Sequence, residues 1–190
     1  MPKRSYLLLL LVVCAALLPA GCRSATIEDA FRRHYPDKSV ELLFTDTVGD
    51  RVLAFFKSPR PDGTEGIGLA VFAGGRGRGW TLTQAGTFYD PGSLAVDMAE
   101  IDLGNEGKKD VVFGYTDDPR IARIETVDRD GSAVEAKLVK TDWKIVWFAI
   151  GDIGTLHVTA WTAQGDLVAE VPKSSEPEAK EEAGAVSGAS

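Results

Sequence analysis

The chain has 190 residues, of which 44% are hydrophobic and 26% charged, and its formal net charge at pH 7 is −7. An acidic chain repels phosphate backbones, so the composition argues against nucleic acid as a partner. A chain of this length can bury about two thirds of its surface, which is enough for a sizeable hydrophobic core.

The first 21 residues have the pattern of an export signal. Lys3 and Arg4 give a positive start, and residues 7–18 form an unbroken apolar run. That run is shorter than the about 20 residues that a membrane-spanning helix needs. We therefore predict that residues 1–21 are a signal peptide that is absent from the mature chain.

The end of this signal, Ala20-Gly21-Cys22, resembles the lipobox of bacterial lipoproteins, although Pro19 stands where that family usually has Leu. The resemblance implies cleavage before Cys22 and a diacylglyceryl group on its thiol. The mature protein would then be lipid-anchored in the cell membrane, on the extracytoplasmic face. The alternative is an ordinary secretory signal that is cut near Ala20 or Gly21 and leaves Cys22 as a free thiol.

A short helix is expected after a tether of residues 22–25. Thr26 can cap its N-terminus, with Asp29 three residues further on. Apolar and aromatic residues then recur at helical spacing. These are Ile27, Ala30, Phe31 and His34.

From residue 39 the hydrophobic period changes to two, which is typical of strands. Turn residues rich in Gly, Pro and Asp separate four β-rich segments, at 40–45, 51–57, 67–72 and 80–84. With the helix they predict an α+β segment over 26–88, in which the helix lies against an antiparallel meander.

The second half repeats the strand rhythm without a helix. Short β-rich segments at 111–115, 121–127, 133–139, 144–149, 155–162 and 166–171 have the spacing of a β-sandwich. Residues 144–150 are apolar on both faces, which predicts a central strand.

The fold class that we predict is mainly β with one short N-terminal helix: the α+β segment followed by a β-sandwich-like domain at 89–171. Residues 86–110 are the least regular part and the expected seam between the halves. The polar composition of 172–190 predicts a disordered acidic tail.

Scattered turn and core positions of the second half resemble the C-terminal part of small uncharacterised lipoproteins of Gram-positive bacteria. The resemblance implies a β-domain in the cell envelope and implies no activity. The positions are Phe113-Gly114-Tyr115, Asp118-Pro119-Arg120-Ile121, Ile124, Asp130-Gly131, Trp147-Phe148 and Ala163-Gln164-Gly165-Asp166.

The segment 102–110 resembles the calcium loops of FG-GAP repeats. Calcium takes six to eight oxygen ligands from alternating loop positions, and Asp102, Glu106 and Asp110 are the candidate ligands. Gly104 supplies no side chain at the third position. The alternative interpretation is a polar turn between two strands.

Few residues could carry catalysis. After the signal the chain has two histidines, His34 and His157, and no Ser in a Gly-x-Ser-x-Gly turn. We assign no catalytic residue. His157 alternates with Thr159 and Trp161 along one strand face, and this strip makes His157 and Trp161 the candidate ligand-binding residues.

The sequence therefore favours a non-enzymatic binding or protein-interaction module of the cell envelope. Its expected partners are the membrane, through the lipid anchor, and an envelope protein or wall polymer. No cofactor is expected apart from a possible Ca²⁺. The alternatives are a calcium-dependent binder that uses the 102–110 loop and an envelope hydrolase.

Overall fold

The computed structural model describes residues 24–75, 77–90 and 92–172. The predicted signal peptide, Cys22 and residues 173–190 of the predicted tail lie outside the described residues. The fold is mainly β with a single short helix, as the sequence predicts.

The helix α2 spans Ile27–His34, and a 3₁₀ turn, η1, spans Gly104–Glu106. The strands are β1 (Glu41–Val48), β2 (Arg51–Pro59), β3 (Glu65–Gly75), β4 (Gly79–Phe88), β5 (Leu94–Asp102), β6 (Lys108–Thr116), β7 (Arg123–Val127), β8 (Ala133–Glu135), β9 (Lys137–Lys140), β10 (Ile145–Gly151), β11 (Val158–Trp161) and β12 (Leu167–Val171).

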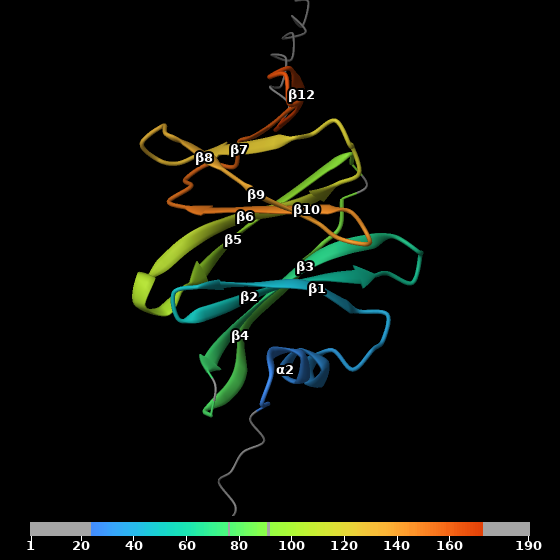
Figure 1. Ribbon diagram of the computed structural model, residues 1–190, viewed down its shortest axis with the longest axis vertical. Helices are drawn as coiled ribbons and strands as arrows, with labels where there is room; N and C mark the ends of the chain where they lie inside the picture. The colour runs from blue at the N-terminus through green and yellow to red at the C-terminus, as the bar shows by residue number, and fades with distance from the viewer. Residues whose placement is uncertain (1–23, 76, 91, 173–190) are drawn as a thin grey trace, which may run out of the picture.

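These strands form three antiparallel sheets. Sheet A has the order β1-β2-β3-β4, sheet B the order β5-β6-β10-β9 and sheet C the order β12-β11-β7-β8. Figure 1 shows the layers stacked along the long axis, with α2 at one end, then sheets A, B and C, and β12 at the other end. Sheet B is thus the middle layer and is covered on both faces.

Helix α2 covers the face of sheet A that points away from sheet B. The Thr26 hydroxyl oxygen accepts a hydrogen bond from the Asp29 N–H at 3.1 Å, which caps the helix as the sequence predicts. Ile27, Ala30 and Phe31 are buried against the sheet. The predicted helix is therefore confirmed, and its apolar side explains its position.

A shared core joins the two halves of the chain. Leu53 and Phe55 of β2 pack with Phe113 of β6 and Phe148 of β10, and the rings of Phe55 and Phe148 lie 4.8 Å apart. Because these side chains come from both sheets, the segments 26–88 and 89–171 bury their apolar surface against each other.

Strand β10 lies between β6 and β9 in sheet B. Its Val146 and Phe148 belong to the core shared with sheet A, whereas Trp147 and Ala149 belong to the core shared with sheet C. The prediction of a central strand that is apolar on both faces is confirmed.

Two expectations about the strands are wrong. The segment 86–110 is not irregular, because its β5 pairs with β6 along its whole length. The segment 133–139 is not one strand: β8 pairs with β7 in sheet C, and β9 pairs with β10 in sheet B. Buried Ala136 lies at the crossing, where its N–H donates to the Ile124 carbonyl at 2.8 Å.

The chain joins the fold earlier than the predicted tether implies. Ser24 is 3% exposed, and its carbonyl accepts a hydrogen bond from the Trp80 N–H at 3.0 Å. The main chain is therefore held against β4 from Ser24 onward. Among the described residues, the structure has no helix with the length and apolar character needed to cross a membrane.

Candidate functional site

The outer face of sheet C forms the end of the molecule opposite α2 (Figure 1). On β11, Val158 and Ala160 are fully buried against sheet B. Because side chains alternate along a strand, Thr159 and Trp161 point outward. The structure therefore places the predicted strip on an uncovered sheet face, where Trp161 is half-buried.

Three side chains form an amphipathic row across this face. Trp161 of β11 pairs with Leu167 of β12 on one side and with Arg123 of β7 on the other. The Arg123 guanidinium carbon lies 5.6 Å from the centroid of the Trp161 ring, and Leu167 is 53% exposed. The row presents an aromatic ring, an aliphatic side chain and a cation together. We call it the outer row.

The backbone, one side-chain hydrogen bond and one ion pair keep the outer row in place. The Trp161 indole N–H donates to the Thr159 hydroxyl at 3.2 Å. The Arg123 guanidinium lies 3.4 Å from a carboxylate oxygen of Glu125 on the same strand. A β-bulge between Ala160 and Trp161 shifts the register with β12 so that Leu167 is the residue opposite Trp161.

His157 lies just before β11 and pairs with a carboxylate. Its Nε2 lies 2.9 Å from Glu170 Oε1 on β12, and the two side chains are 40% and 37% exposed. The ring also borders a hollow of about 760 Å³, which Val127–Arg129 and Gly154–Thr155 line as well. The structure thus places His157 just before the strand that carries Trp161 and gives the two residues different neighbours.

A carboxylate in this hollow has a structural role. Asp128 Oδ1 accepts hydrogen bonds from the N–H groups of Asp130 and Ser132, both at 3.1 Å. These bonds shape the turn between β7 and β8, where Gly131 has a φ of +89°. Residues 128–132 therefore form the turn of an antiparallel hairpin between β7 and β8.

The residues proposed for calcium lie between β5 and β6. Asp102 Oδ1 accepts a hydrogen bond from the Gly104 N–H at 2.8 Å, which shapes the turn that contains η1. Glu106 ends η1, and Asp110 lies on β6 opposite Glu100 of β5. Among the residues that the structure describes, no group of three His, Cys, Asp or Glu is placed to hold a metal ion. Asp102, Glu106 and Asp110 are therefore not brought together as one such group.

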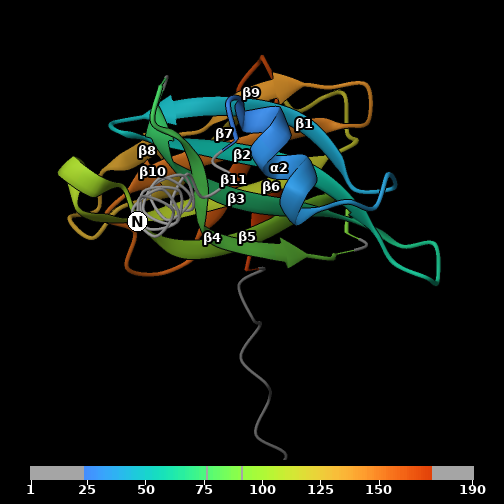
Figure 2. The same cartoon turned by 90° about the horizontal axis from the view of Figure 1, so that it is seen from below.

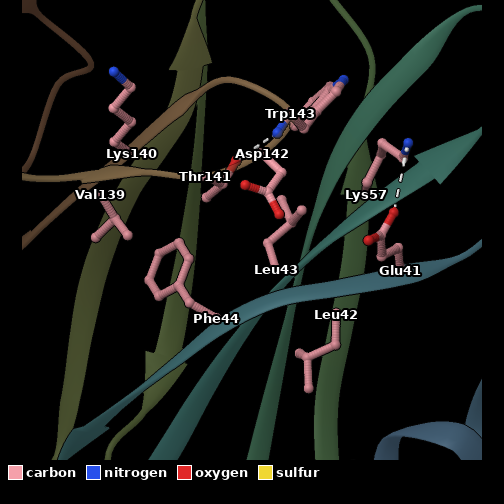
Figure 3. A pocket seen from close by; sticks show the side chains of 10 residues that line it. All are labelled: Glu41, Leu42, Leu43, Phe44, Lys57, Val139, Lys140, Thr141, Asp142 and Trp143. Carbon is pink, nitrogen blue, oxygen red and sulfur yellow. Dashed lines mark hydrogen bonds and ion pairs between the residues drawn. The ribbon is translucent and has the colours of Figure 1, made fainter.

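A second hollow, of about 490 Å³, lies where the edge strand β1 of sheet A faces the edge strand β9 of sheet B. Figure 3 shows Leu43, Phe44 and Val139 turned toward this gap and Leu42 turned away from it. A β-bulge between Leu42 and Phe44 explains why the consecutive residues Leu43 and Phe44 of β1 can face the same side of the sheet.

The rim of this hollow is a network of ion pairs and hydrogen bonds. Lys57 Nζ lies 3.6 Å from Glu41 Oε2 and 3.3 Å from Glu65 Oε1. The Trp143 indole N–H donates to Glu65 Oε2 at 2.7 Å. This hydrogen bond, together with Lys57, lowers the pKa of the Glu65 carboxyl. Glu41, Lys57 and Trp143 at the rim therefore already have partners within the protein.

Sequence reasoning missed this hollow and the outer row. The hollow lies between segments that are about a hundred residues apart in the sequence. The outer row takes one residue from each of three strands that are separated in the sequence. The sequence does contain one sign of this hollow. The apolar run Leu42-Leu43-Phe44 breaks the alternation expected of a strand, at the position of the bulge.

Comparison with models of known protein families, with known proteins and with solved structures finds no match for this chain.

Proposed function

We propose that this protein is a lipoprotein of the cell envelope, anchored in the membrane by an acylated Cys22 on the extracytoplasmic side. Its folded part serves as a non-enzymatic interaction module that binds an envelope protein through the outer row. The proposal combines the lipobox-like leader with the position of the outer row in the fold.

The observation that carries the binding role is the exposed row of Arg123, Trp161 and Leu167 at one end of the stack, while the chain enters the fold at Ser24 near the other end (Figure 1). Trp and Arg are the residue types that most often dominate protein–protein binding energies. A Leu that is 53% exposed beside them adds apolar area that a partner can remove from water.

Crosslinking in cells tests this role. A photoreactive amino acid replaces Leu167 in one variant and Lys108, whose side chain is 70% exposed, in the other. We expect capture of a defined envelope protein from position 167 and not from position 108. The Trp161→Ala change in the position-167 variant should abolish the capture. Equal capture from both positions, or an adduct with a wall polymer in place of a protein, would contradict the proposal.

Labelling with an alkyne fatty acid tests the anchor separately. We expect the parent protein to incorporate the label and the Cys22→Ser variant to lose it. Equal labelling of the two proteins would overturn acylation at Cys22.

A further inference from the structure

The site of the proposed lipid is separated from the folded chain by very little main chain. Ser24 is buried and hydrogen-bonded to Trp80 of β4. Cys22 precedes Ser24 by two residues, and an extended chain spans at most about 3.6 Å per residue. The Cα atom of Cys22 therefore lies within about 7 Å of the Cα atom of Ser24. A lipid on Cys22 would bring this end of the fold to the membrane surface.

The layer at this end is α2. Ser24 lies just before the Thr26 cap, and Trp80, its partner, packs in the same apolar cluster as Phe31 of the helix. Figure 2 shows α2 and β4 toward the viewer when the molecule is seen from below. Sheets B and C lie behind sheet A, so the exposed side of α2 and the loop 35–40 that follows it face outward.

Basic side chains lie at the C-terminal end of α2. Arg33 and His34 are exposed in its last turn, and Lys38 is exposed in the following loop. Arg32 has a structural role, because its guanidinium donates to the Val40 carbonyl at 2.7 Å. The acidic residues of this end are Glu28, Asp29 and Asp37, and the Asp37 carboxylate accepts the Ser39 N–H at 2.9 Å.

The other end of the stack is more acidic. Residues 117–136 and 152–171, which include all of sheet C, contain more acidic than basic residues. The acidic ones are Asp117, Asp118, Glu125, Asp128, Asp130, Glu135, Asp152, Asp166 and Glu170, and the basic ones are Arg120, Arg123 and Arg129. The charge therefore changes along the stacking axis, and an anionic membrane would attract the α2 end more than the sheet C end.

We propose that the C-terminal half of α2 and the loop 35–40 lie directly on an anionic lipid bilayer, with Arg33, His34 and Lys38 at the headgroups. The three sheets then stack outward from the membrane, and the outer row faces away from it. This inference rests on the proposed anchor at Cys22. A lipid anchor and exposed basic side chains act together, since the anchor holds Arg33 and Lys38 within the range of the surface potential.

The test couples the protein to vesicles by chemistry that needs no acylating enzyme. The chain from Cys22 onward contains every described residue and has Cys22 as its single thiol. This thiol is joined to a maleimide lipid in vesicles of phosphatidylcholine with phosphatidylglycerol. Hydroxyl-radical footprinting then measures oxidation of His34 and Tyr35, with oxidation of Trp161 in the same sample as the reference.

We expect the ratio of His34 and Tyr35 oxidation to Trp161 oxidation to fall about threefold on coupling, because the headgroups cover the α2 end. Arg33→Glu with Lys38→Glu should restore most of the ratio. Lys108→Glu with Lys140→Glu changes the net charge equally at two exposed positions of sheet B and should leave the fall intact. A flexible insertion of about 12 Gly and Ser residues after Cys22 should also weaken the protection.

An unchanged ratio in the coupled parent protein would overturn the proposal, and so would an equal fall in both charge variants. Either result would leave acylation of Cys22 untouched, because the vesicle experiment supplies the anchor chemically. Conversely, equal fatty-acid labelling of the parent protein and the Cys22→Ser variant would refute the anchor but would not alter the vesicle result. The two inferences can therefore fail separately.

Discussion

Gly104 faces Asp50 so closely that a methyl group on Gly104 would lie 1.9 Å from Asp50 Oδ1. Asp50 belongs to the β1–β2 turn, where its other carboxylate oxygen lies 2.9 Å from the Arg51 guanidinium. The turn between β5 and β6 thus docks against a turn of sheet A. This contact explains why the calcium-like segment has no side chain at its third position: the space is occupied by Asp50.

Gly104→Ala should lower the free energy of unfolding by about 2 kcal/mol, because the left-handed backbone disfavours Ala and the Asp50 side chain must shift to make room. The new methyl group meets Asp50, and the residue also has a φ of +68°, which disfavours any side chain. Gly131→Ala is the matched control, because Gly131 has a φ of +89° and no atom within 4 Å of the built methyl group. It should cost only about 1 kcal/mol. Urea denaturation measures both, and equal losses would show that the contact with Asp50 contributes nothing.

Asp102→Ala should lower stability by about 1 kcal/mol by removing the acceptor for the Gly104 N–H. Because this role is structural, the loss should be the same with calcium and with a chelator. Thermal denaturation under the two conditions distinguishes this from metal binding. If calcium stabilises the parent protein but not the variant, the loop 102–110 is a calcium site and the structural interpretation is wrong.

Asp118 should titrate well below the ordinary carboxyl range. Hydrogen bonds from the Arg120 guanidinium and then from the Arg120 N–H lower the pKa of Asp118 to about 2. The folded-state pKa lies below the ordinary value, so the stabilising effect is complete above the ordinary pKa. It is lost as the pH falls through about 2.

Arg120→Ala should raise the pKa of Asp118 toward its ordinary value while the backbone hydrogen bond keeps part of the shift. Carboxyl-detected NMR titration measures the change. Arg123→Ala removes a guanidinium that pairs with Glu125 instead, and it serves as the control. An Asp118 pKa that is the same in the parent and in Arg120→Ala would refute the assigned cause.

Phe31→Ala should cost about 3–5 kcal/mol of folding stability. The side chain is fully buried, and the centroid of its ring lies 4.9 Å from that of the Tyr35 ring and 5.3 Å from that of the Phe56 ring. Arg33→Ala on the exposed side of the same helix should change stability by less than about 0.5 kcal/mol. Denaturation curves of both variants check whether α2 is an integral layer of the fold, and a small effect of Phe31→Ala would show that it is not.

The strands that the sequence identified best are those whose hydrophobic pattern is unambiguous. In β10 every residue of 146–149 is apolar, and both faces are indeed covered. Strand β5 was missed because Asp97 and Glu100 interrupt its apolar residues, one on each face, so neither face has a clear alternation. Its pairing with β6 supplies the backbone hydrogen bonds that the local pattern does not indicate.

The candidate site shows the same division. Alternation along one strand sufficed to place Trp161 on the uncovered face of sheet C. The neighbours that complete the face, Leu167 and Arg123, depend on strand order and on the bulge in the pairing of β11 with β12. Register across a sheet is a property of two strands together, so one strand's sequence does not contain it.

By itself, the sequence determined the mainly β class, the capped helix 27–34 and most turns, because each depends on residues close together in the chain. Tertiary structure alone decided that the strands form three stacked sheets, that the chain crosses from sheet C to sheet B at Ala136, and that Ser24 is bound to Trp80. These features depend on which apolar faces cover each other, and burial between distant segments is decided by the whole chain at once.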